Sequence, residues 1–363
     1  MIPLTLGRGP RRAVVAPLFL ALAAAAVLPL ATARAATPAA SASASAPSAS
    51  AAAASVGPRP WFVLNSLDAS ISVVDPVKFT ELRRLPTGKE PHHLYLTPDE
   101  KSLMVANALG DSLTLVDPVT GQIQRVIDGI SDPYQLRFSP DMKWFVTAGN
   151  RLDHVAIYHW QPADAAQPLK LAARVSAPKT PSHLMIDSRS SVVYASLQDS
   201  DQLTAIDLAT QKTRWTIPVG KMPADIFLFA NDTRLLVALT GGREVEVYDV
   251  TQTPPVKVKR IETNLGAHAF RAQGDGRHVF VSNRASDTIS RIDLQTLSVV
   301  DTYPAPGGPD CMDMLADGKT LLVTSRWARK LTAIDITQHR VVRQLSLGKS
   351  PHGVWTLDHA PRQ

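Results

Sequence analysis

One short apolar pattern recurs seven times along this chain and restricts the fold more than any other feature. Each copy is a five-residue segment of mostly apolar residues that ends at an aspartate or, once, at a histidine. The copies end at Asp75, Asp117, His159, Asp207, Asp249, Asp293 and Asp335. Successive ends are 42, 42, 48, 42, 44 and 42 residues apart, which is the size of a propeller blade. An aspartate here accepts hydrogen bonds from the backbone N–H groups that follow it, so we interpret all six as turn residues.

The repeated unit contains the pattern of one antiparallel sheet. The stretch from Pro91 to Gly129 has four short apolar runs separated by polar turn segments, which is typical of four β-strands. Second strands end ten residues before the end of each third strand, at Asn65, Asn107, Gly149, Leu197, Leu239, Asn283 and Ser325. First strands follow a proline or glycine, at Pro91, Pro133, Pro181, Pro223, Gly266, Pro309 and Pro351. One such sheet cannot bury both its faces, so the copies must pack on one another.

The two ends of the repeat region complement each other. The segment that starts at Pro351 is a first strand with no successor, and the segment that starts at Trp61 lacks a first strand. Pairing them completes one blade, which closes the ring and removes open sheet edges. We therefore predict an all-β fold, a seven-bladed β-propeller of four-stranded antiparallel blades over residues 58–363, closed by pairing N- and C-terminal strands in one blade.

Several segments resemble YVTN-type β-propeller repeats. They are SLMVANALGDSLTLVDPVTGQIQRVI at 102–127, HVFVSNRASDTISRIDLQTLSVVDTY at 278–303 and IPVGKMP at 217–223. The resemblance covers residues 58–363 and implies a propeller of the WD-repeat and quinoprotein-like group. It also implies a distant similarity to the haem-binding propeller of cytochrome-type nitrite reductases. No single activity follows, because propellers host many functions.

The N-terminal region reads as a leader followed by a linker. Residues 1–35 combine a basic start at Arg8, Arg11 and Arg12 with an apolar run and an Ala-Arg-Ala segment, which is typical of a secretory signal peptide. Residues 36–57 are almost entirely Ala, Ser and Pro, which predicts a flexible linker. We therefore expect a periplasmic or secreted protein without a membrane span after signal removal. An uncleaved anchor is the alternative, and the choice between Sec and twin-arginine export stays open.

The balance of charged residues and the absence of several sequence motifs argue against some classes of function. Four of the 38 basic residues lie in the leader, which has no acid, so the rest of the chain has 34 basic and 32 acidic residues. That near-balance argues against nucleic acid as a partner. The single cysteine, Cys311, excludes an internal disulfide. The motifs G-x-S-x-G, H-E-x-x-H and C-x-x-C are absent, and no catalytic residue is assigned.

The candidate functional residues lie where the first strands begin, a point that faces the central channel of a propeller. Counting from the proline or glycine gives one equivalent position, occupied by His93, Gln135, His183, Asp225, His268, Cys311 and Gly353. The position before it is occupied by His92, Tyr134, Ser182, Ala224, Ala267, Asp310 and His352. Loops after the second strands are expected on the same face, where they add Arg151, Arg243, Arg284, Arg326 and Trp327.

Three interpretations of these residues remain open. The first is a polar lining that satisfies strand ends and holds channel water. The second is a site for a small anionic ligand, with the candidates His92, His93, His183, Asp225, His268, Asp310, Cys311, His352, Arg284 and Arg326. The third is a transition-metal or haem-type site. Its metal ligands would be His93, His183 and His268, with Cys311 as a thiolate or Asp225 as the fourth.

We therefore expect an exported, monomeric propeller that binds a protein or a small anionic ligand on its channel face. The alternatives are a cofactor-bearing oxidoreductase-related protein, with a metal or a haem-type group, and a lactone hydrolase. Both classes occur on propellers.

Overall fold

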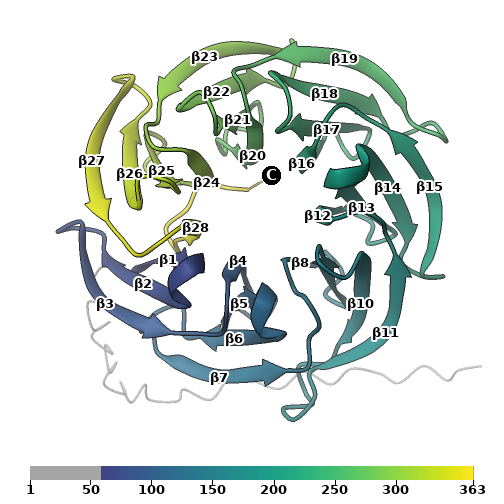
Figure 1. Cartoon of the computed structure of the whole chain (residues 1–363), viewed down its shortest axis with the longest axis horizontal. Coiled ribbons are helices and arrows are strands. Elements are labelled where there is room, and N and C mark those ends of the chain that lie inside the picture. The colour runs from purple at the N-terminus through teal and green to yellow at the C-terminus, as the bar shows by residue number, and fades with distance from the viewer. Residues whose placement is uncertain (1–58, 363) are drawn as a thin grey trace, which may run out of the picture. The chain divides into compact units, whose positions relative to one another are not determined.

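The computed structural model describes residues 59–362, which form seven four-stranded antiparallel sheets arranged around a central channel (Figure 1). The predicted seven-bladed propeller is confirmed. The predicted signal peptide (1–35) and linker (36–57) lie outside the described residues and stay predictions. Within the described part of the chain, no helix has the length and hydropathy needed to cross a membrane.

Each blade has an inner, a second, a third and an outer strand. The inner strands are β4 (Pro91–Leu96), β8 (Gln135–Phe138), β12 (Pro181–Ile186), β16 (Pro223–Phe229), β20 (Ala267–Ala272), β24 (Pro309–Met314) and β28 (Pro351–Trp355). The second strands are β1 (Trp61–Asn65), β5 (Leu103–Asn107), β9 (Trp144–Gly149), β13 (Val192–Leu197), β17 (Arg234–Leu239), β21 (His278–Asn283) and β25 (Thr320–Ser325).

The third strands are β2 (Ser70–Asp75), β6 (Ser112–Val116), β10 (His154–Trp160), β14 (Gln202–Asp207), β18 (Glu244–Asp249), β22 (Thr288–Asp293) and β26 (Lys330–Asp335). The outer strands are β3 (Thr80–Pro86), β7 (Ile123–Asp128), β11 (Leu169–Ser176), β15 (Lys212–Pro218), β19 (Val256–Glu262), β23 (Ser298–Pro304) and β27 (Arg340–Ser346). Three short 3-10 helices follow second strands: η1 (Ser66–Asp68), η2 (Ala108–Gly110) and η3 (Gln198–Ser200).

The ring closes as the sequence predicts. Strand β28 pairs antiparallel with β1, with Phe62 opposite Trp355 and Val63 opposite Val354. The order β28-β1-β2-β3 makes one blade from both ends of the repeat region. Because the ring is closed, the inner strand of every blade has the inner strand of a neighbouring blade on each side.

The recurring aspartates have the predicted turn role. Asp75 Oδ1 accepts hydrogen bonds from the backbone N–H groups of Val77, at 2.8 Å, and Lys78, at 3.0 Å. Asp117 repeats the arrangement with Val119 and Thr120, at 2.8 and 2.7 Å. The aspartates therefore fix the turn between the third and outer strands and lie far from the channel.

The hydrophobic core lies between blades and not inside any one of them. Phe62 and Leu64 of β1 and Leu103 and Val105 of β5 are fully buried in one cluster that joins two neighbouring blades. Each such side chain contributes roughly 1.5–3 kcal/mol when it leaves water. A blade without its neighbours would lose this burial, which is why the repeats fold as a ring.

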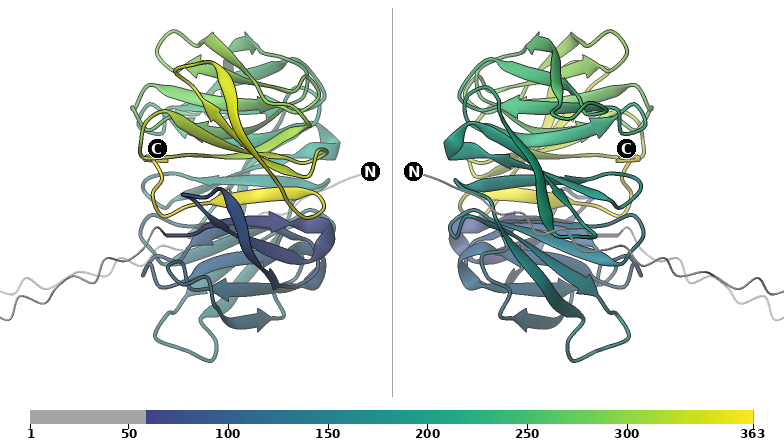
Figure 2. Two further views of the ribbon diagram at one scale, coloured as in Figure 1. Left: turned by 90° about the vertical axis from the view of Figure 1, so that its left-hand side faces the viewer. Right: turned by 90° about the vertical axis from the view of Figure 1, so that its right-hand side faces the viewer.

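The two faces of the disc differ. Ser66 of η1 donates its backbone N–H to the carbonyl of Ser350, at 3.1 Å, so the 3-10 helices and the starts of the inner strands share one face, here the top face. Residues 356–362 follow β28 and lie on the opposite, bottom face, where the N–H of Ala360 bonds the carbonyl of Met314 at 2.7 Å. Figure 2 shows the disc edge-on with these two features on opposite sides. Each inner strand therefore runs from the top face to the bottom face.

Candidate functional site in the central channel

A β-bulge near the start of the inner strands directs two successive side chains into the channel. Pro91 pairs with Asn107 and Leu94 with Val105, so His92 and His93 share the space of one partner residue. The same shift occurs in the inner-strand pairs of five other blades. A bulge of this kind re-aims side chains that would otherwise alternate between faces, and the rings of His92 and His93 have centroids 4.9 Å apart.

The residues at these two positions form two layers, to which the seventh blade adds Tyr134 and Gln135 without a register shift. The upper layer, nearer the top face, contains His92, Tyr134, Ser182, Ala224, His268, Asp310 and His352. The lower layer contains His93, Gln135, His183, Asp225, Ala269, Cys311 and Gly353.

The predicted equivalence of His268 with His93 and His183 is wrong. Ala267 pairs with Asn283 as Pro91 pairs with Asn107, so alanine stands at the proline position in this blade. Gly266 instead occupies the turn position before the strand, where the backbone is left-handed with a φ of 86°. A Cβ at this position would lie 2.8 Å from the backbone nitrogen of Ala285, which accounts for the glycine, so Gly266 does not mark the strand start.

His92 is stacked between two rings of neighbouring blades. Its ring centroid lies 3.6 Å from that of His352 and 3.9 Å from that of Tyr134. His352 Nδ1 lies 2.7 Å from the carbonyl oxygen of His92, to which its N–H donates. His92 and His352 are almost completely buried, so the upper layer closes the channel at this level.

Asp310 anchors the other side of the upper layer. Its carboxylate accepts hydrogen bonds from Arg284 Nη2, at 2.7 Å, and Arg326 Nη1, at 3.2 Å. Burial by itself raises the pKa of Asp310, but the neighbouring groups, the Arg284 guanidinium above all, hold that pKa well below its usual range. The structure thus brings the predicted residues Asp310, Arg284 and Arg326 together as a charge-compensated group in which the carboxylate is buried and the arginines are half-buried.

His268 completes this group without an aligned hydrogen bond to the carboxylate. Its Nε2 lies 3.2 Å from Asp310 Oδ1, yet this nitrogen has no hydrogen-bond partner of good geometry among the described residues. Its Nδ1 lies 3.1 Å from the hydroxyl oxygen of Thr240. We interpret the contact with Asp310 as electrostatic proximity of a neutral ring, because burial lowers the pKa of His268 to about 3.

The channel histidines are neutral at neutral pH. Burial lowers the pKa of His352 to about 3 and lowers the pKa of His92, His93 and His183, while the neighbouring imidazoles lower those of His92 and His93 further. A buried imidazole cannot replace the hydration that its charged form would lose. The rings therefore present nitrogen lone pairs, and not positive charges, to the channel.

Some lower-layer side chains join blades to one another. Gln135 accepts a hydrogen bond from the backbone N–H of Leu184 in the next blade. Asp225 does the same for the N–H of Phe270, at 2.8 Å. The interpretation of a lining that satisfies strand ends thus accounts for Gln135 and Asp225.

The expectation that Cys311 would be a thiolate is wrong. Burial raises the pKa of this thiol well above its usual value, and Asp310 and Asp225 raise it further. The neighbouring imidazoles were expected to favour the anion, but they are neutral. Cys311 Sγ lies 3.5 Å from His352 Nδ1, so it is a weak hydrogen-bonding neighbour of the upper layer.

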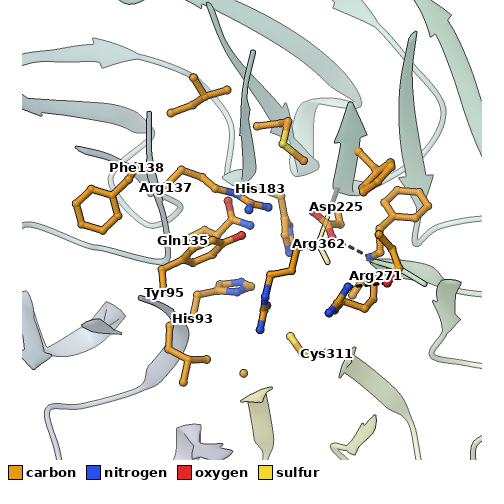
Figure 3. A pocket seen from close by; sticks show the side chains of 18 of the residues that line it. His93, Tyr95, Gln135, Arg137, Phe138, His183, Asp225, Arg271, Cys311 and Arg362 are labelled. Atoms are coloured by element: carbon orange, nitrogen blue, oxygen red, sulfur yellow. Dashed lines mark hydrogen bonds between the residues drawn. The ribbon is translucent and has the colours of Figure 1, made fainter. Parts of the chain in front are cut away.

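Below the lower layer the channel widens into a pocket of about 630 Å³, here called the channel pocket. All seven lower-layer residues line it, and no upper-layer residue does. Its walls carry apolar and aromatic side chains from the inner strands, among them Tyr95, Phe138, Met185, Phe227, Phe270 and Met312. Figure 3 shows His93, His183 and Arg137 around this space.

Arg137 is the unusual member of the channel pocket. Its Nε donates to the carbonyl of Leu184, at 3.0 Å, and its guanidinium carbon lies 4.6 Å from the centre of the Tyr95 ring. Within the described residues it forms no ion pair, and burial lowers its pKa to about 10 despite the attraction of Asp225. Sequence reasoning missed Arg137, although its place two residues after Gln135 on the same strand was a usable signal.

The other two arginines of the channel pocket already have carboxylate partners. Arg271 Nε bonds Asp313 Oδ1 at 2.9 Å, and its remaining N–H groups bond carbonyls that include Ala360 and Pro361. Arg362 Nη2 bonds Asp313 Oδ2 at 2.8 Å. These contacts fix residues 356–362 on the bottom face, which leaves Arg137 as the described cation of the pocket without a carboxylate.

Two groups of potential ligands lie close enough to hold a metal ion within residues 59–362. In each, one ligand atom per residue lies within 4.8 Å of the others; the groups are His92, His93, His352 and His268, Asp310, His352. Neither contains His183 or Cys311. The rings of His183 and His93 have centroids 5.2 Å apart, and those of His183 and His268 5.6 Å apart. The structure therefore does not gather the predicted set His93, His183, His268 and Cys311 around one point.

The fold and the two-layered channel define a seven-bladed β-propeller with a pocket on its axis. A family model described as a YNCE-like β-propeller matches residues 14–362, so the chain belongs to the YNCE-like β-propeller family. This confirms the kinship with repeat propellers that the sequence indicated. A search of curated proteins finds no significant match.

Solved structures share the fold at low sequence identity. The periplasmic gluconolactonase PpgL of Pseudomonas aeruginosa is 17% identical, with a TM-score of 0.69, over 84% of this chain and 99% of that one. Dihydro-heme d1 dehydrogenase NirN in complex with DHE is 16% identical, with a TM-score of 0.62, over 82% and 75%. A functionally unknown protein from Desulfotomaculum acetoxidans is 14% identical, with a TM-score of 0.70, over 82% and 98%. At these identities the likeness concerns the fold alone.

Proposed function

We propose that this protein is a binding protein that takes a small anionic molecule with an apolar portion into the channel pocket. The observation that carries the proposal is Arg137, a half-buried cationic side chain at the wall of a cavity that has no carboxylate partner among the described residues. Desolvating a charge without a partner is costly, and a carboxylate or phosphate entering the pocket would relieve that cost through charge-assisted hydrogen bonds.

The rest of the pocket is compatible with such a ligand. Tyr95, Phe138 and Phe270 offer apolar contact area, and a few polar groups at the lower layer are available to orient the molecule. The neutral state of His93 and His183 means that these rings add hydrogen bonds and not further charge. Arg137 is therefore expected to supply most of the selectivity for an anion.

The test is ligand-dependent stabilisation measured by thermal shift and calorimetry. The probes are inorganic phosphate and a series of carboxylates from acetate to phenylpropionate. We expect the aromatic carboxylate to raise the melting temperature most, because a ligand that binds only the folded state stabilises it by mass action. Arg137→Met should abolish the shift. Arg340→Met, on the exposed face of β27, should leave it unchanged. Equal shifts in wild type and Arg137→Met would refute the proposal.

A second candidate is a cofactor-bearing or lactone-hydrolysing propeller. His93 lines the channel pocket and has a buried, unpartnered Nε2, and a neutral imidazole nitrogen is the kind of ligand that binds haem iron. NirN is solved with a haem-related compound and PpgL is a gluconolactonase, which makes both activities worth assaying here. A Soret band in protein purified from its own host would support the cofactor class, and turnover of gluconolactone would support the hydrolase.

Export is part of the proposal and rests on residues 1–35 alone. The basic start, the apolar run and the Ala-Arg-Ala segment support a cleaved signal peptide. N-terminal sequencing of the protein recovered from the periplasm or medium should begin after residue 35. An unprocessed N-terminus in the cytoplasmic fraction would contradict export.

A further inference from the structure

We infer that the throat of the channel is a transition-metal site whose protein ligands are His92, His93 and His352. One ligand atom from each of these residues lies within 4.8 Å of the other two, and all three side chains are buried. The inference does not involve Arg137, on which the anionic ligand proposed for the channel pocket depends, although His93 belongs to both sites.

Unpartnered ring nitrogens are the second observation. His92 Nδ1, His93 Nε2 and His352 Nε2 are buried and have no hydrogen-bond partner among the described residues. Buried polar atoms are almost always paired, so three orphaned nitrogens in one cluster need an explanation. A metal ion held by the three rings would account for unpartnered nitrogens here, because a neutral imidazole nitrogen is a common metal ligand.

The surroundings of His352 fit that role. Its Nδ1–H donates to the carbonyl of His92 at 2.7 Å, which fixes the tautomer and leaves Nε2 as the nitrogen with a free lone pair. Metal-bound histidines typically donate their second ring N–H to a backbone carbonyl in this way. The stacked ring of His92 has to turn relative to His352 for its nitrogen to face the same ion, since the two planes are only 33° apart.

The competing group is a weaker candidate. His268, Asp310 and His352 also have ligand atoms within 4.8 Å. However, Arg284 and Arg326 already neutralise the carboxylate of Asp310, at 2.7 and 3.2 Å. A divalent ion at that carboxylate would have to displace or repel two guanidinium groups. The triad of three neutral imidazoles has no such competitor in direct contact.

The chemistry of the ligands selects the metal. Imidazole suits zinc, copper, iron and nickel, and three histidines leave a fourth coordination position for water or another small ligand. His93 lines the channel pocket, so the pocket gives an ion access to the triad from the bottom face. We assign the site to Zn²⁺ or Cu²⁺.

The experiment loads chelator-treated full-length protein with Zn²⁺ or Cu²⁺ and measures stoichiometry by calorimetry and elemental analysis. We expect one ion per chain, with nitrogen hyperfine structure in the electron paramagnetic resonance spectrum of the copper form. His93→Gln and His352→Gln should each weaken binding roughly tenfold or more. His339→Gln, an exposed histidine on the outer rim, should bind as wild type does.

Each outcome decides the inference. Loss of binding in both triad variants, with wild-type binding in His339→Gln, supports the site. No stoichiometric binding by wild type, or unchanged binding in a folded His93→Gln protein, overturns it. His93 is the variant on which the decision rests if His352→Gln does not fold, because His93 lies at the pocket surface and circular dichroism can verify its fold.

Discussion

The upper layer of the channel and the wall of the channel pocket are built from the same inner strands and their loops, yet their charges are balanced differently. In the upper layer Asp310 lies between Arg284 and Arg326, so its charges are compensated within the protein. Just below the lower layer Arg137 is half-buried and has no carboxylate against it within the described chain. A compensated buried charge holds blades together, whereas an uncompensated one at a cavity wall indicates a ligand.

The same contrast separates two uses of polar side chains. The side-chain oxygens of Gln135 and Asp225 accept hydrogen bonds from backbone N–H groups of the next blade. His92, His93 and His352 each keep a nitrogen that no described residue satisfies. Polarity alone does not identify a site, because a lining that closes the ring is polar too. What distinguishes the candidate sites is the unsatisfied group.

The largest effect should come from deleting the residues after Ser350, which removes β28 and with it a member of both layers. The loss exposes the edge of β1 and the core of two blade interfaces. We expect an aggregated product or one without a cooperative unfolding transition, as measured by calorimetry. Deleting residues 36–57 is the control and should leave the melting temperature unchanged. A truncated protein that melts within a few degrees of the full chain would contradict the closure.

Replacing Asp310 by Asn tests the compensation in the upper layer. Two half-buried guanidinium groups would lose their common counter-charge, which should lower the free energy of unfolding by about 1.5–3 kcal/mol in urea denaturation. Asp225→Asn is the matched change in the lower layer, where the carboxylate only accepts backbone N–H bonds, and it should cost less. Equal losses in the two variants would remove the distinction drawn between the layers.

Acid should destabilise the protein through the channel histidines. Their pKa values are lowered in the folded state, to about 3 for His268 and His352, while the unfolded chain titrates near 6.5. Below about pH 6.5 the unfolded state therefore binds protons that the folded state does not bind. Each such histidine then lowers the free energy of unfolding by about 1.4 kcal/mol per pH unit. Asp310, whose pKa is depressed, loses its contribution in turn as the pH falls below the usual aspartate range.

The measurement is the free energy of urea unfolding between pH 7.5 and 5. His183→Gln should make the dependence shallower by about one proton. If the free energy of unfolding does not change between pH 7 and 5, the histidines have the same pKa in the folded and unfolded states. That result would contradict the neutral state of the rings in the folded protein.

A smaller effect distinguishes Arg137 from the upper-layer arginines. Arg137→Met removes a desolvated charge without a counter-ion, so the free energy of unfolding should rise or change by less than about 1 kcal/mol. Arg326→Met breaks a charge-assisted contact to Asp310 and should lower it by about 1–3 kcal/mol. Denaturation of the two variants in parallel gives the comparison directly. Greater destabilisation by Arg137→Met would mean that its contacts with the Leu184 carbonyl and the Tyr95 ring outweigh the cost of the unpaired charge.

The smallest effect concerns Cys311. Because burial raises its pKa, the thiol should react with Ellman's reagent at pH 8 at least roughly tenfold more slowly in the native protein than in denaturant. Cys311→Ser should change stability little. A native thiol that reacts as fast as the denatured one would restore the thiolate expected from the sequence.

Residue spacing was sufficient to predict most of the fold. The seven copies, the blade size and the strand shared by both termini follow from local patterns and from the need to bury both faces of each sheet. Spacing also failed at one point, because Gly266 was taken as the strand start. Counting sixteen residues back from Asn283, as from Asn107 to Pro91, leads to Ala267.

By itself, the sequence determined the propeller, its closure and the fact that histidines gather at the starts of the inner strands. These features depend on contacts between residues close in sequence or related by the repeat. Only the tertiary structure decided which of these side chains meet, because a bulge aims two successive residues inward and neighbouring blades bring together residues 42 or more apart, such as Asp310 and His352. It also decided which charges are compensated, since the pairing of Asp310 and the isolation of Arg137 depend on distances across the channel that no local pattern encodes.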